Sequence, residues 1–260
     1  MLVDSHAHLL SLEDPVEAVS RAAEEGVGKI ISIGTGLESS LATVELSRKY
    51  RGVYVSVGIH PHSSSDFSEE VMRGIEEMVR DPKVVAVGET GLDYHYMNSP
   101  REDQIRSFEA HMELSRRHSL PFVVHVRDAD GEMLEILRGM DLGANPGVIH
   151  CFSGDYQTAR KYLDLGFFIS FSGIVTFRRA REVRDAASKI PIERLLYETD
   201  SPYLAPVPER GKPNEPRNVV HVARLVSELR GLPLEEFTSI VFENMTELFA
   251  KVSKDRDGLI

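Results

Sequence analysis

The sequence predicts an α/β fold in which eight parallel strands and their helices form a (β/α)8 barrel, and three observations support this prediction. Short β-branched runs alternate along the chain with longer amphipathic stretches, which is typical of βα units. The length of 260 residues is close to the roughly 250 that one barrel needs. In addition, His, Glu and Asp repeatedly follow the ends of the apolar runs, and a barrel gathers such strand ends on one rim.

The eight expected strands are short runs rich in Val, Ile, Leu and Phe. In chain order they lie at residues 2–4, 29–33, 53–57, 84–87, 122–124, 147–149, 167–171 and 195–197. Amphipathic stretches between these runs predict helices. The clearest are residues 15–25, 68–80 and 101–118, and two of them have proline close to the start, where it fits a first helical turn.

The eighth expected strand is followed by a proline-rich loop, residues 201–216, and then by helical patterns near 217–230 and 233–251. No linker, repeat, low-complexity tract or charge block divides the chain. We therefore expect a single domain over residues 1–260, a TIM-type barrel with additional C-terminal helices.

Charge and composition restrict the classes of function. Thirty Lys and Arg against 41 Asp and Glu give a net charge of −11, which argues against a protein that grips long nucleic acids by neutralising phosphates. An enzyme acting on a nucleic-acid end in a small pocket remains compatible with this charge. No apolar run approaches the roughly 18 residues that span a bilayer, and the single cysteine, Cys151, suits a reducing cytosol. We expect a cytoplasmic protein without membrane contact and without an obligate protein partner.

The segment Asp4-Ser5-His6-Ala7-His8 is the sharpest local signal for a metal site. In an extended chain, residues two apart point the same way, so His6 and His8 present both rings to one side. Two imidazoles at this spacing suit Zn²⁺ or another borderline divalent ion.

Glu89 ends the apolar run of the fourth strand. A buried carboxylate is costly without a partner, so Glu89 should meet a cation, and its two oxygens can bridge two metal ions. It is a metal-ligand and catalytic candidate. Asp93, four residues later, is expected to orient a metal-bound histidine from behind.

His125 ends the fifth run and His150 the sixth, so both should share the rim with Glu89 and form a pocket for a second ion. Arg127 is a candidate clamp for a substrate phosphate. A surface salt bridge is the alternative role for Arg127.

Asp200 ends the eighth run, where it can bind one ion and act as general base toward the attacking water. Glu198 lies on the same strand face, one layer deeper, and is expected to support ligand geometry. After the third strand, His60 is close enough to contact a substrate phosphate or an outer polar group, whereas His62 should face solvent. Aromatic side chains around the rim are candidates for stacking on unpaired bases. Tyr94 and Tyr203 are the preferred substrate contacts of this kind, and Tyr96 is a further candidate.

The segments DSHAHL, GIHPH, GETGLDY, PFVVHVRD, HCFSG and ETDSPYLAPVPERGKPNEP resemble the signature segments of the TatD family of metal-dependent deoxyribonucleases, within the amidohydrolase-like barrels. They occur in family order from Asp4 to Pro216. The resemblance implies a TIM-type barrel with two divalent metal ions (Mg²⁺, Mn²⁺ or Zn²⁺). The ligands it implies are His6, His8, Glu89 and Asp200 around one ion, and Glu89, His125 and His150 around the other. It also implies hydrolysis of DNA phosphodiester bonds by two-metal activation of water, as a 3′-to-5′ exonuclease on single strands or 3′ ends.

Two other functions compete with this one. A related barrel can hydrolyse a small cyclic amide, lactone or phosphoester, but many such enzymes bridge their metals with a carbamylated lysine where this chain has Glu89. The nearby Lys83 precedes the strand. A non-enzymatic, metal-stabilised scaffold is the other alternative, and an open rim argues against it because structural sites are usually closed.

Overall fold

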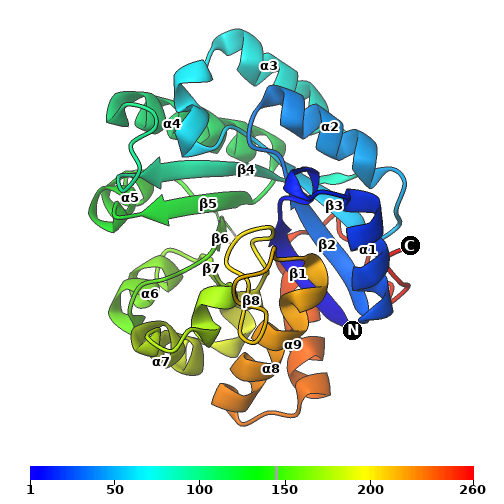
Figure 1. Cartoon of the computed structure of the whole chain (residues 1–260). Coiled ribbons are helices and arrows are strands. Elements are labelled where there is room, and N and C mark those ends of the chain that lie inside the picture. The colour runs from blue at the N-terminus through cyan, green and yellow to red at the C-terminus, as the bar shows by residue number, and fades with distance from the viewer. Residues whose placement is uncertain (144–145) are drawn as a thin grey trace.

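Eight parallel strands form the centre of the molecule and helices surround them (Figure 1). The computed structural model describes residues 1–143 and 146–260. The strands are β1 (Leu2–Ala7), β2 (Val27–Ile33), β3 (Val53–Val57), β4 (Val84–Asp93), β5 (Phe122–Arg127), β6 (Gly147–Ile149), β7 (Phe168–Phe171) and β8 (Leu195–Tyr197). Each strand pairs with the next one in chain order, always in parallel. The predicted barrel is confirmed.

The helices lie on the outside of the barrel (Figure 1). They are α1 (Pro15–Glu24), α2 (Leu37–Ser47), α3 (Glu69–Met78), α4 (Arg101–His118), α5 (Asp130–Arg138), α6 (Tyr156–Leu163), α7 (Arg181–Lys189), α8 (Val219–Arg230) and α9 (Leu234–Leu248); α1 to α7 connect successive strands, and α8 and α9 follow the last strand. Local signals set their starts: Asp14 accepts a hydrogen bond from the Glu17 amide at 3.0 Å, and Pro15 opens α1. Among the described residues, none of these helices combines the length and the apolar character needed to cross a bilayer.

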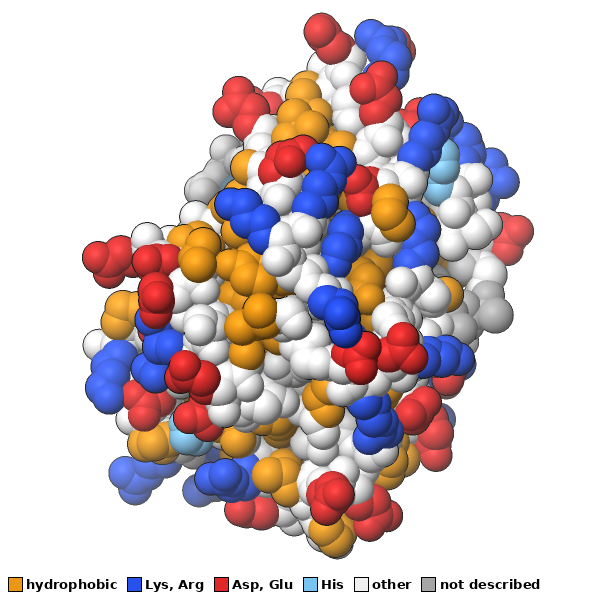
Figure 2. Space-filling model, turned by 90° about the vertical axis from the view of Figure 1, so that its right-hand side faces the viewer, with side chains coloured by type: hydrophobic (Ala, Val, Ile, Leu, Met, Phe, Trp, Pro, Cys, Tyr) orange, Lys and Arg blue, Asp and Glu red, His pale blue; other side chains and the backbone are white. Residues whose placement is uncertain are grey.

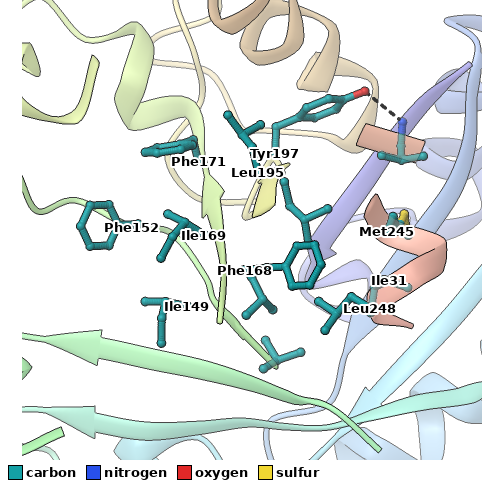
Figure 3. Packing of buried hydrophobic residues seen from close by; sticks show 14 of the residues in the cluster. Ile31, Ile149, Phe152, Phe168, Ile169, Phe171, Leu195, Tyr197, Met245 and Leu248 are labelled. Atoms are coloured by element: carbon teal, nitrogen blue, oxygen red, sulfur yellow. Dashed lines mark hydrogen bonds between the residues drawn. The ribbon is translucent and has the colours of Figure 1, made fainter. Parts of the chain in front are cut away.

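The last helix, α9, joins the core of the barrel. Figure 3 shows Met245 and Leu248 of α9 in the same buried cluster as Ile31 of β2, Phe168 of β7 and Tyr197 of β8. Burial of one such side chain contributes about 1.5–3 kcal/mol to folding, so α9 is an integral part of the domain.

The seam between β1 and β8 closes the barrel in an unusual way. In the part of the chain that the structure describes, a single bridge between Ala7 and Ser201 replaces a continuous ladder here. The buried carboxylate of Asp4 accepts hydrogen bonds from the Thr199 amide at 2.8 Å and from the Thr199 hydroxyl at 2.6 Å. The Asp200 amide donates to the His6 carbonyl at 2.9 Å. Side-chain and isolated backbone contacts therefore hold the first strand against the last.

Three strands extend further toward the rim than the apolar runs predict. β1 continues through His6, β4 through Glu89 to Asp93, and β5 through His125. In β4 the pairing with β5 shifts register between Gly88 and Thr90, which leaves Glu89 outside the ladder. Gly88 has a φ of +123° and a side chain there would lie 2.4 Å from the Val123 carbonyl oxygen, so only glycine fits beside Glu89.

The outer surface carries both signs of charge. On the face that Figure 2 shows, Lys and Arg lie among Asp, Glu and hydrophobic side chains. Pairs such as Arg21–Glu215 at 2.8 Å and Arg51–Asp257 at 2.9 Å join opposite charges. Attraction for a polyanion must therefore arise at a local site, since the chain as a whole carries a net charge of −11.

Candidate metal centre

The barrel gathers the predicted ligands at the C-terminal ends of its strands. The donor atoms of each of three groups lie within 4.8 Å of one another: His6, Glu89 and His150; His6, His8 and Asp200; and His60, Glu89 and His125. All six residues predicted as metal ligands belong to these groups, and His60 joins them. Five of the six are buried, and His125 is half-buried.

The first set of donors surrounds one point between β1, β4 and β8. The Nε2 atoms of His6 and His8 are 3.3 Å apart. Glu89 Oε2 lies 3.4 and 3.6 Å from them, and Asp200 Oδ1 lies 3.7 and 3.4 Å from them. Ligands about 2.1 Å from a tetrahedral ion are separated by about 3.4 Å, so both imidazoles lie at a suitable spacing from each other and from each carboxylate oxygen for a divalent ion such as Zn²⁺.

Glu89 has the features of a bridging ligand. Within residues 1–143 and 146–260, its buried Oε2 atom has no hydrogen-bond partner. Its other oxygen, Oε1, lies 2.8 Å from His150 Nε2 and 3.0 Å from His125 Nδ1, and these two nitrogens are 3.3 Å apart. The two carboxylate oxygens thus face two different donor sets. A buried carboxylate oxygen without a hydrogen-bond partner, placed among imidazole nitrogens, fits the role of a metal ligand.

Two carboxylates behind the rim determine which ring nitrogen faces the centre. Asp93 Oδ2 accepts from His125 Nε2 at 3.0 Å, and Glu198 Oε1 accepts from His150 Nδ1 at 3.2 Å. Each of these rings therefore carries a hydrogen on the outer nitrogen, and the inner nitrogen that faces Glu89 can bind an ion through its lone pair once it has lost its own proton. Both carboxylates contact histidines of the candidate centre, and their supporting role stays a prediction.

The centre is strongly coupled electrostatically. Burial alone would lower the pKa of His150, but Glu89 and Glu198 outweigh it and raise this pKa well above the usual range. Burial would raise the pKa of Glu89, yet the imidazoles of His150, His60 and His6 and a hydrogen bond from His125 hold it well below its usual range. In the metal-free protein, protons thus occupy the imidazoles that a cation would displace, so metal binding releases protons.

The expected solvent-facing position of His62 is wrong. Its side chain is 30% exposed and Nε2 donates to Asp93 Oδ2 at 2.9 Å, the same oxygen that accepts from His125. Sequence reasoning also missed Asp4, whose role at the seam depends on a contact with Thr199. Burial raises the pKa of Asp4 to about 8 despite the hydrogen bonds from Thr199. The sequence signal that could have identified Asp4 is its position as an acidic residue inside an apolar strand.

The predicted substrate contacts occupy different surroundings. Tyr203 is 56% exposed and its ring centroid is 5.8 Å from that of His8. Arg127 is exposed, with its guanidinium 4.8 Å from the centroid of Tyr96, which is itself 54% exposed. Two exposed tyrosines thus flank the centre.

The hydroxyl of Tyr94, in contrast, donates to Glu132, and Arg101 lies over its ring at 5.7 Å. These partners belong to α4 and α5. A substrate contact by Tyr94 stays a prediction.

The barrel fold and the donor set at its rim define a metal-dependent hydrolase. A family model described as TatD related DNase matches residues 3–250, so the chain belongs to this family. It is 42% identical over 254 residues to YcfH of Escherichia coli K12, named as an uncharacterized metal-dependent hydrolase, covering 95% of both chains.

Two further relatives agree with this assignment. The chain is 36% identical to a 3′-5′ ssDNA/RNA exonuclease TatD of Klebsiella pneumoniae strain 342, over 91% of this chain and 92% of that one. The crystal structure of YjjV, a TatD homologue from Escherichia coli K12, superposes with a TM-score of 0.90 at 32% identity, covering 96% of this chain and 98% of that one. The family resemblance in the sequence is confirmed.

Proposed function

We propose that the chain is a deoxyribonuclease that removes nucleotides from 3′ ends with the help of two divalent ions, acting as a single domain over residues 1–260. The carboxylate of Glu89 carries this proposal, because its two oxygens face two donor sets. The name of the Klebsiella relative supports a nucleic-acid substrate. The single cysteine supports a cytoplasmic location, and no obligate protein partner is required for the site, since one chain supplies all its donors.

His6, His8, Glu89 and Asp200 would hold one ion, and Glu89, His125 and His150 the other. Bound at these positions, two divalent ions supply activation of water and stabilisation of the charge on phosphoryl oxygens; Mg²⁺, Mn²⁺ and Zn²⁺ are the candidates.

Among the protein groups, Asp200 is placed to accept the proton of the attacking water. His8 holds the pKa of Asp200 below its usual value, against the effect of burial, so this carboxylate is ionised at neutral pH. Asp93 and Glu198 hold a hydrogen on the outer nitrogens of His125 and His150, so the inner nitrogens are the ones that can bind the ion.

The burial of the donors favours a single-stranded substrate. Glu89 is 1% exposed and Asp200 8% exposed, so the scissile phosphate must enter a recess in the rim. An unpaired 3′ end fits this requirement better than an intact duplex. The exposed ring of Tyr203 can stack on a base, Arg127 can hold a neighbouring phosphate, and Tyr94 can make a further substrate contact.

The position of Lys83 speaks against a carbamylated-lysine hydrolase of cyclic amides, lactones or phosphoesters. Its ammonium donates to the carbonyl oxygens of Tyr50, Arg51 and Val53 at 2.6, 3.0 and 3.1 Å. It therefore lies just before β4 begins, away from the C-terminal part of the strand that contains Glu89.

A digestion of 5′-labelled single-stranded DNA tests the proposal. With Mn²⁺ or Mg²⁺ we expect a ladder of shortened labelled products that disappears with EDTA. Glu89→Gln should lower the rate about a thousandfold, because metal ions contribute several kcal/mol to such reactions. Glu70→Gln, an exposed glutamate of α3, is the matched control and should cleave normally. Persistent full-length DNA with a metal-loaded protein would overturn the proposal.

A further inference from the structure

His60 lies against the second donor set, directly before the turn η2 (Pro61–Asp66). Its Nε2 atom is 3.4 Å from Glu89 Oε1, and its ring centroid is 4.8 Å from that of His125. The side chain is 15% exposed. Distance alone therefore permits two roles for His60: it can bind an ion through a lone pair on Nε2, or it can direct an N–H group toward the substrate.

The hydrogen bond on the other side of the ring decides between these roles. His60 Nδ1 accepts from the backbone N–H of His62 at 3.1 Å and so caps the turn. A backbone N–H can only donate, so Nδ1 holds a lone pair and the neutral ring carries its hydrogen on Nε2. A nitrogen that carries hydrogen offers no lone pair to a metal ion. Binding an ion there would require moving the hydrogen to Nδ1, where it would face the amide hydrogen of His62.

The three imidazoles around Glu89 Oε1 therefore fall into two types. Outer carboxylates accept the N–H groups of His125 and His150, so the inner nitrogens of these two rings can bind an ion once they lose their proton. At His60 the outer partner is a donor, so the N–H points inward. The same carboxylate oxygen thus meets two ligand nitrogens and one hydrogen-bond donor.

We propose that His60 is a catalytic residue that donates its Nε2–H to a non-bridging phosphoryl oxygen of the substrate and does not bind a metal ion. This role rests on the phosphodiesterase function proposed above. No proton is transferred and no covalent bond forms in this contact. Because negative charge on that oxygen grows in the transition state, a fixed donor stabilises the transition state more than the bound substrate.

Two substitutions separate the cap from the donor. His60→Asn keeps an oxygen near the position of Nδ1, so it can still accept from the His62 amide, but it removes the inward N–H. His60→Gln places an amide N–H near the position of Nε2 and removes the cap. Thermal unfolding of both variants reports any loss from the cap separately.

The measurements are the affinities of each protein for Mn²⁺ and, in the Mn²⁺-loaded protein, for inorganic phosphate, together with kcat on single-stranded DNA. For His60→Asn we expect phosphate binding to weaken about tenfold and kcat to fall about a hundredfold, with Mn²⁺ affinity within about threefold of wild type. His60→Gln should bind phosphate more tightly than His60→Asn. Long-range ¹H–¹⁵N spectra of the wild type should show the Nε2–H tautomer of His60 both without metal and after loading with Zn²⁺. Zn²⁺ replaces Mn²⁺ in this measurement because it is diamagnetic.

Several results would overturn the donor role: an Nδ1–H tautomer, a Mn²⁺ affinity that falls with both substitutions, or phosphate binding by His60→Asn equal to wild type. These results are distinguishable from failure of the nuclease function. If phosphate binding depends on the His60 N–H but DNA is not cleaved, the donor stands and the substrate is different. If DNA is cleaved but His60→Asn binds phosphate normally, the nuclease stands and the donor role is wrong.

Discussion

Replacing Asp93 with Asn should selectively weaken the second of the two metal positions proposed above. Asp93 Oδ2 accepts from the Nε2 atoms of His62 at 2.9 Å and His125 at 3.0 Å, while Oδ1 accepts from the amides of His95 at 3.1 Å and Tyr96 at 2.9 Å. The Asn oxygen can keep both amide contacts, but the Asn nitrogen donates and cannot accept from imidazole. His125 then loses the partner that holds its hydrogen on Nε2.

The expected loss is one of metal affinity. Supporting partners of metal-bound histidines typically contribute 10- to 100-fold in affinity, which corresponds to about 1.4–2.8 kcal/mol. We therefore expect one of two Mn²⁺ binding steps to weaken by this factor, measured by titration against a competing chelator, with nuclease activity falling in parallel at limiting metal.

The chain offers a matched control for this substitution. Asp128 pairs with His95 at 3.0 Å, and both side chains are about half exposed or more, at 67% and 48%. Asp128→Asn should leave both Mn²⁺ affinities unchanged, because an exposed pair contributes little and His95 is not placed among the donors. Unchanged Mn²⁺ binding by Asp93→Asn would refute the tautomer-holding role of Asp93.

Three further predictions concern stability. His111 is buried, and burial lowers its pKa to about 4. Its Nε2 atom accepts a hydrogen bond from the Ile59 amide at 3.0 Å, and its Nδ1 atom contacts the Ser107 carbonyl at 2.6 Å. Because the unfolded chain gains a proton near pH 6.5 and the folded one only near 4, stability should fall by about 3 kcal/mol between these values, and urea titrations of His111→Gln should show a shallower fall. Thr199→Val removes the 2.6 Å hydrogen bond to Asp4 and should cost about 1–3 kcal/mol, measured by urea unfolding at pH 7; no change would mean that this bond does not hold the seam. Metal at a hundredfold excess over its Kd should stabilise the metal-free protein by about 2.7 kcal/mol, seen as a higher melting temperature that EDTA reverses, whereas an unshifted transition would exclude tight binding to the folded state.

The barrel and the converging donors could be predicted from the sequence because both follow from strand ends. His6, Glu89, His125, His150 and Asp200 each mark the point where an apolar run stops, and parallel strands bring such points together. The run pattern ended strands too early, since it counts polar side chains such as Glu89 as loop although they belong to β4.

The contacts that depend on tertiary partners could not be predicted. The GIHPH segment contains both His60 and His62, but their ring orientations depend on a backbone amide and on Asp93. Likewise, Asp4 meets Thr199 only because the barrel closes there. Local patterns carry residue type and spacing, whereas tautomers and seam contacts are determined by neighbours remote in the chain.

Because the barrel closes between its first and last strands, the donors of the centre come from both ends of the barrel sequence and are completed late in synthesis. His6 and His8 leave the ribosome first, but Asp200 follows only with the last strand, on the order of ten seconds or more later at usual elongation rates. A nascent chain, or a fragment cut before β8, holds imidazoles without Asp200, the carboxylate that we propose as the acceptor of the proton of water. The chain can therefore catalyse hydrolysis only after the barrel has closed, and an incompletely synthesised or truncated chain is inactive.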